Sequence, residues 1–113
     1  MAGAPGRAAS REPLMLPLRF FEEAGREIDK ERSFYRERSE SAEAAFLREL
    51  DHAIQSISEA PQRWPVHIED TRRYVFPSFP FSLVYFVEHG TVLIVALEHQ
   101  SRRPGYWVER LRQ

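Results

Sequence analysis

Two apolar runs joined by a short link constrain the fold of this chain more than any other feature. The first run, residues 81–87, alternates between two sets of side chains with the period of two that is typical of a strand. The second run, residues 91–97, is apolar at nearly every position and rich in β-branched residues, which predicts a strand covered on both faces. Gly90 lies in the link and can adopt the positive φ of a tight turn. We therefore expect a buried antiparallel hairpin.

Two helices are predicted before this hairpin. Residues 22–38 start with two glutamates, which complement the positive end of a helix dipole. The next helix has Ser39 or Ser41 as its cap and ends before Pro61. Its apolar residues fall at the spacing of one buried stripe: Phe46, Leu47, Leu50, Ala53, Ile54 and Ile57. The short polar link between the helices predicts an antiparallel helical hairpin.

Further strands are predicted on either side of the helices. Residues 14–21 alternate, but Pro17 cannot donate to a ladder, which indicates an edge strand. Residues 71–76 form the next strand, and short links join it to the apolar hairpin. The chain is therefore predicted to be α+β, with an N-terminal edge strand and a helical hairpin on one face of a sheet that ends in a three-stranded antiparallel meander.

The length of 113 residues suits one domain, to which we assign residues 14–113. Residues 1–13 are rich in Ala, Gly, Pro and Ser, and we interpret them as a disordered tail without the apolar core of a secretory signal. No apolar run is long enough to span a bilayer. The lack of cysteine excludes disulfides and thiolate metal sites, and the scattered histidines predict no metal site.

Residues near the predicted strand ends could carry chemistry: Arg72, Arg73, His99, Arg102, Arg103 and Tyr106. Guanidinium groups suit phosphate or carboxylate partners, and histidine and tyrosine can transfer protons. We expect the end of the last strand, residues 91–97, to lie near the start of the strand at residues 71–76. This would bring Arg73 towards His99 and Arg102. Such a cluster suits metal-independent cleavage of RNA, whose 2′-hydroxyl is an internal nucleophile.

A purely structural role is the alternative for these residues. Arg102 and Arg103 would then be solvated, while Tyr106 and Trp107 would pack the C-terminal segment against the rest of the domain. On the residue types alone, the structural role is the favoured interpretation.

The same stretch resembles the RelE/ParE toxin superfamily, and most closely its ParE, or plasmid-stabilisation, branch. The resemblance rests on Phe79-Pro80-Phe81-Ser82-Leu83-Val84-Tyr85 and on His99-Gln100-Ser101-Arg102-Arg103-Pro104-Gly105-Tyr106-Trp107. That branch commonly shows an arginine, here Arg73, before an "FPY…Y" strand, and then a strand that ends in "H-x-x-R-x-P-x-Y-W". The resemblance covers about residues 16–107.

The resemblance implies a cytoplasmic toxin of a type II toxin–antitoxin pair, without metal or cofactor, that is neutralised by a small antitoxin. The ParE branch is associated with inhibition of DNA gyrase, and the RelE branch with cleavage of mRNA on the ribosome. The net charge of −1 and the single lysine favour the ParE branch, because RNA binding requires phosphate neutralisation. A degenerate, non-toxic member is a third possibility.

Each interpretation assigns roles to particular residues. In the ParE-like toxin, a protein target or the antitoxin is contacted by Arg72, Arg73, Arg102, Arg103 and Trp107. In the RelE-like endoribonuclease, arginines 73, 102 and 103 bind phosphate, while His99 and Tyr106 transfer protons. The antitoxin contact is expected on the sheet edge and along the helical hairpin, where a strand or an amphipathic helix could be added.

Overall fold

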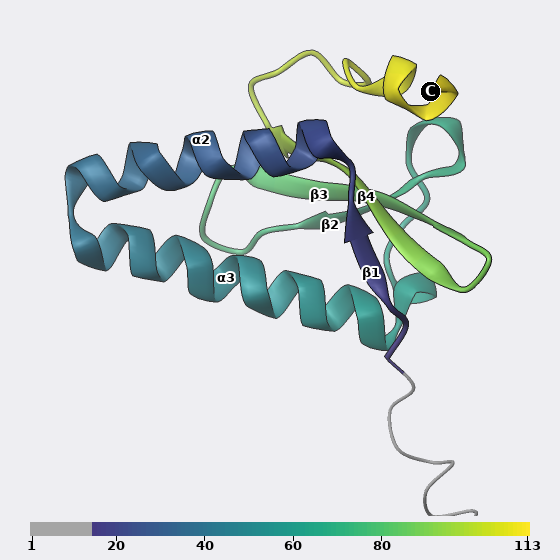
Figure 1. Ribbon diagram of the computed structural model, residues 1–113, viewed down its shortest axis with the longest axis horizontal. Coiled ribbons are helices and arrows are strands. Elements are labelled where there is room, and N and C mark those ends of the chain that lie inside the picture. The colour runs from purple at the N-terminus through teal and green to yellow at the C-terminus, as the bar shows by residue number, and fades with distance from the viewer. Residues whose placement is uncertain (1–14) are drawn as a thin grey trace, which may run out of the picture.

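Two helices pack on one face of a four-stranded sheet in the computed structural model, which describes residues 15–113 (Figure 1). The strands are β1 (Leu18–Phe20), β2 (Arg72–Val75), β3 (Phe81–Glu88) and β4 (Thr91–His99), in the spatial order β1-β4-β3-β2. Strand β1 runs parallel to β4, and the other neighbours are antiparallel. The predicted α+β fold, with its N-terminal edge strand and its three-stranded meander, is therefore confirmed. The tail predicted for residues 1–13 lies outside the described residues.

The edge strand β1 is shorter than predicted, because it begins only after Pro17. The carbonyl of Pro17 still accepts a hydrogen bond of 2.9 Å from the backbone N–H of Val92. Before the proline, Leu16 donates its N–H to Ser58 at the end of the second helix, at 3.1 Å. The proline thus separates a segment bonded to the helix from a segment bonded to the sheet.

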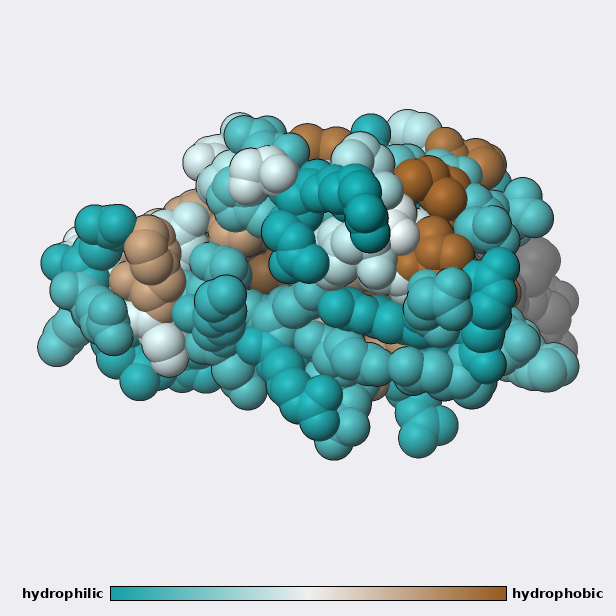
Figure 2. Space-filling view, turned by 90° about the horizontal axis from the view of Figure 1, so that it is seen from above, coloured by the Kyte–Doolittle hydropathy of each residue, from teal (hydrophilic) through white to brown (hydrophobic). Residues whose placement is uncertain are grey.

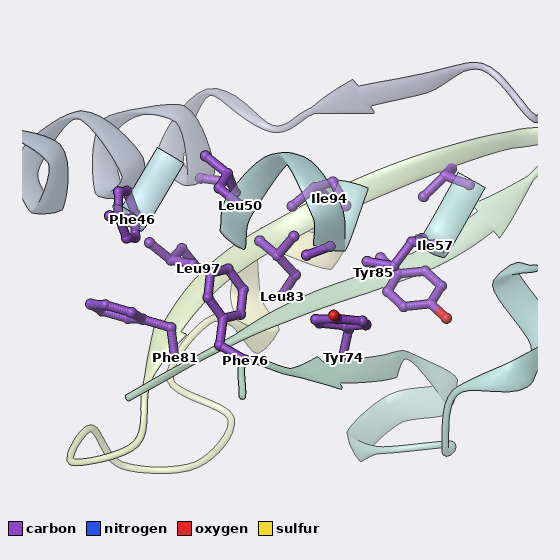
Figure 3. Close-up of a cluster of buried hydrophobic side chains, with 13 residues drawn as sticks. Phe46, Leu50, Ile57, Tyr74, Phe76, Phe81, Leu83, Tyr85, Ile94 and Leu97 are labelled. Atoms are coloured by element: carbon purple, nitrogen blue, oxygen red, sulfur yellow. The ribbon is translucent and has the colours of Figure 1, made fainter. Parts of the chain in front are cut away.

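The helical hairpin consists of α2 (Glu22–Arg38) and α3 (Glu40–Glu59), with Ser39 between them. Of the two predicted caps it is Ser39 that acts, because its Oγ accepts a hydrogen bond of 3.0 Å from the N–H of Ala42. Figure 3 shows how the predicted stripe of α3 meets the sheet, with Phe46, Leu50 and Ile57 among the buried side chains of the central strands.

The link between β3 and β4 is a two-residue turn. Glu88 pairs with Thr91, and His89 and Gly90 between them have φ values of 51° and 75°. Two successive positive φ values are the signature of the type I′ turn, whose twist matches that of the flanking strands. The role predicted for Gly90 is confirmed.

Both faces of β4 are covered, as predicted. On the helical face Ile94 and Leu97 belong to the main core, and on the other face Val95 and Ala96 pack against Trp107. Trp107 is fully buried and is followed by the short 3₁₀ helix η3 (Val108–Arg112), which lies at the C-terminal end of the chain in Figure 1. Within residues 15–113 no helix has the length and apolar character needed to cross a membrane.

Candidate functional site

The sheet register separates two residues that we expected to lie together. Arg73 pairs with Val84, which pairs with Ala96 on β4, whereas His99 pairs with Phe81. Strands β2 and β4 run in the same direction, so the end of β4 lies beside the end of β2, and the expectation that it lies near the start of β2 was wrong.

The two residues also occupy opposite faces of the sheet. Directly paired residues share a face. Phe81 belongs to the core under the helices, and Val84 to the core under Trp107. The predicted cluster of Arg73 with His99 is therefore not assembled.

His99 is partly buried at the end of β4. Its Nδ1 accepts a hydrogen bond of 2.9 Å from the N–H of Ser101, and its ring meets Phe81 edge to face with centroids 5.2 Å apart. With Nδ1 occupied as an acceptor, the neutral ring carries its proton on Nε2. The imidazole thus shapes the turn that follows β4.

Tyr106 takes part in a network centred on a carboxylate that the sequence did not single out. Its hydroxyl donates to Oε2 of Glu27 at 2.5 Å, and Arg110 donates to both oxygens of Glu27 at 3.0 and 2.9 Å. The backbone N–H of Leu97 donates to Oε1 of Glu27 at 3.0 Å. Burial, and then the Glu27 carboxylate, raise the pKa of Tyr106 above its ordinary value. The phenol therefore holds its proton at neutral pH and uses it to bind Glu27.

The arginines differ in exposure. Arg73, Arg102 and Arg103 are exposed. The guanidinium of Arg102 lies over the ring of Tyr106, 3.8 Å from its centroid. Arg72 is half-buried and donates to the carbonyl of Trp64 at 2.6 Å, so it holds the segment before β2.

Trp107, which we expected to contact a partner, is fully buried and packs against Val95 and Ala96 of β4. Its indole N–H donates to Oε2 of Glu98 at 3.1 Å. A buried indole offers no surface to a partner in this conformation. The structure thus brings Arg102 and Tyr106 together at the C-terminal end of β4, with Trp107 beneath the neighbouring surface.

Glu98 and His67 form a second polar group that the sequence did not reveal. Oε1 of Glu98 lies 3.8 Å from Nε2 of His67, and neither atom has a hydrogen-bond partner. Burial, and then the charge of Arg73, lower the pKa of His67. One signal was available in the sequence: Glu98 directly follows the apolar run of residues 91–97, at a position that alternation places on the same face as Ala96. Among residues 15–113 no three acidic or histidine side chains gather as they would to hold a metal ion.

Comparisons with known proteins agree with this architecture. The family described as ParE toxin of the type II toxin–antitoxin system, parDE, matches residues 18–104. A solved chain of the chromosomal ParDE TA system from P. aeruginosa superimposes with a TM-score of 0.66 at 13% identity, covering 75% of this chain and 96% of that one. At this identity the likeness shows the fold alone. No curated protein matches the chain.

Proposed function

The chain belongs to the ParE toxin family of type II toxin–antitoxin systems, and from this premise we propose that it is a toxin that acts by binding a protein target. DNA gyrase is the expected target. A cognate antitoxin neutralises the toxin, and both act in the cytoplasm.

One observation carries the proposal of protein binding over RNA cleavage. The hydroxyl of Tyr106 is bound to Glu27, and the pKa of Tyr106 is raised, so this tyrosine is not poised to exchange a proton at neutral pH. The other proton-transfer candidate, His99, lies on the opposite face of the sheet from Arg73. Arg73 is thus separated by the sheet from His99.

The arginines at this end of the sheet suit a protein interface. Arginine is enriched among the residues that dominate binding energy in protein complexes. Arg102 is exposed but already held over the Tyr106 ring by a cation–π contact, so less side-chain freedom is lost when it meets a partner. Arg103 is its exposed neighbour, and the buried Trp107 stabilises the segment that follows. We assign the target contact to Arg102 and Arg103, with Arg73 as a further contact on the face that Trp107 covers.

The test in cells uses induction of the chain with and without its antitoxin. Induction should stop division, and plasmid DNA recovered from the arrested cells should lose negative supercoils while total mRNA stays intact. Co-expression of the antitoxin should restore both growth and supercoiling. Intact supercoiling together with cleaved mRNA would contradict the proposal and support an endoribonuclease, and the absence of any growth effect would support a non-toxic family member.

A further inference from the structure

The face opposite the helices contains an open groove of about 960 Å³ beside the C-terminal segment. We call it the acidic groove. It is lined by residues 21–23, 69–71, 86–88, 93 and 110–113, which come from the start of α2, the loop before β2, the β3–β4 hairpin and the C-terminal segment. Figure 2 shows hydrophobic side chains gathered towards this end of the molecule, bordered by hydrophilic ones.

The floor of the groove is apolar. Phe21 and Phe86 meet edge to face with ring centroids 6.2 Å apart, which fixes the position of both rings. Leu93 and Leu111 add partly buried aliphatic surface, and Val87 is 42% exposed. These side chains offer apolar surface that a partner could cover.

The rim of the groove is acidic. Five carboxylates line it: Glu22, Glu23, Glu69, Asp70 and Glu88. The lining has two arginines, so its formal charge is 2 − 5 = −3, whereas the whole chain carries −1. Of these arginines, Arg110 is already bound to the Glu27 carboxylate. The groove therefore presents a net negative rim around an apolar floor.

From this combination we infer that the acidic groove binds a cationic amphipathic segment of the cognate antitoxin. The inference rests on the proposed function, because it presupposes an antitoxin. Apolar side chains of the segment would cover Phe86, Val87 and Leu93, and its flanking Lys or Arg residues would meet the carboxylates of the rim. This is the recognition of an amphipathic peptide in a groove, with charge complementarity fixing its position.

Two features favour the antitoxin over the target as the occupant. Long-lived complexes bury more apolar surface than transient ones, and the floor of the groove is apolar. The exposed Arg102 and Arg103 follow the end of β4, whereas Val87 and Glu88 lie at the hairpin turn, at the opposite end of the same pair of strands. The target contact and the antitoxin contact can therefore be separate surfaces.

The helical hairpin, which together with the sheet edge is the predicted antitoxin contact, exposes little apolar surface. Among the exposed large hydrophobic side chains of residues 15–113, Phe34 is the one that lies on α2 or α3. Arg38 stacks on that ring at 4.2 Å from its centroid. Val87 lines the acidic groove, and the remaining exposed large hydrophobic side chains lie on or just before the edge strands β1 and β2: Met15, Phe20, Val66 and Val75.

The experiment measures the affinity of the full chain for purified antitoxin, expressed from the reading frame that neighbours its gene, by titration calorimetry. The groove variant combines three substitutions in one chain: Glu69→Lys, Asp70→Lys and Glu88→Lys. A control variant with the same change in charge is Glu37→Lys with Asp51→Lys and Glu59→Lys, three exposed positions outside the groove. A second groove variant, Val87→Asp, changes one exposed floor residue and keeps the test valid if the triple variant does not fold.

We expect both groove variants to raise the Kd about tenfold or more, and the control to change it by a factor of about three or less, since charge pairs across an interface outweigh general surface charge. Equal affinity of the groove and control variants would overturn the inference while leaving antitoxin binding, and hence the proposed function, in place. Failure of the unmodified chain to bind the antitoxin would overturn the proposed function and the inference together.

Discussion

The hydroxyl of Tyr106 donates a hydrogen bond of 2.5 Å to Oε2 of Glu27, which lies 79 positions earlier in the chain. The contact ties the segment after β4 to the first turns of α2. Arg110 and the N–H of Leu97 complete the environment of the same carboxylate. A tyrosine at the end of an "H-x-x-R-x-P-x-Y-W" pattern thus serves to join three parts of the fold.

Replacement of Tyr106 by phenylalanine separates this structural role from a catalytic one. Tyr106→Phe removes one hydrogen bond to a charged acceptor and should lower the free energy of unfolding by about 1.5–3 kcal/mol. Chemical denaturation measures this loss. Growth arrest at a temperature where the variant is folded should persist, and its abolition in folded protein would show that the hydroxyl is needed for function.

Replacement of Glu27 should be more damaging. Glu27→Ala leaves Arg110, whose side chain is 16% exposed, and the N–H of Leu97 without their acceptor. Removal of one partner from a largely buried ion pair is expected to lower the free energy of unfolding by about 3 kcal/mol. The matched control is Glu23→Ala, which loses a surface hydrogen bond from Gln113 and should change stability far less. Equal effects of the two variants in urea denaturation would contradict the network described here.

The stability of the protein should depend on the protonation of His67. Burial, followed by the charge of Arg73, lowers the pKa of His67 in the folded state, although the nearby Glu98 carboxylate opposes this. The unfolded chain then binds a proton more readily than the folded one. The free energy of unfolding should therefore fall as the pH drops below about 6.5, the ordinary pKa of histidine.

Substitution tests this assignment. His67→Gln should flatten the pH dependence between about 7 and 5, the range in which an unperturbed histidine titrates. The exposed His52 serves as the control, and His52→Gln should leave the dependence unchanged. If His67→Gln retains the full slope in denaturation at a series of pH values, another group is responsible.

The junction of the two helices depends on one serine. Ser39→Ala removes the acceptor for the N–H of Ala42 at the start of α3 and should lower the free energy of unfolding by about 1 kcal/mol. Ser41→Ala, two residues away, keeps that cap and should have a smaller effect in thermal unfolding. The opposite ranking would assign the cap to Ser41.

The elements of this fold were predictable because strong local patterns specify them. The apolar run of β4, the stripe of α3 and the positive φ at Gly90 each depend on short-range spacing. The edge position of β1 followed from Pro17, which cannot donate to a ladder. These signals do not require knowledge of which residues meet across the sheet.

The candidate site was less predictable, because its residues meet through long-range register. The face that a strand residue occupies changes with each step, so the relation between Arg73 and His99 depends on the pairing of three strands. A register shift opposite Val84 and Tyr85 leaves Val95 without a partner and so alters the count along β4. Glu27 reaches Tyr106 from helix α2, and no spacing along the chain indicates that contact.

The most direct test of the account is a supercoiling assay with purified DNA gyrase and the purified chain, free of antitoxin, run beside a translation reaction that reports mRNA cleavage. We predict inhibited supercoiling and intact mRNA. Inhibition should be weaker in the double variant that carries Arg102→Ala and Arg103→Ala, and it should be preserved in Tyr106→Phe. Active gyrase together with mRNA cleavage that is lost in Tyr106→Phe would contradict the account and identify an endoribonuclease.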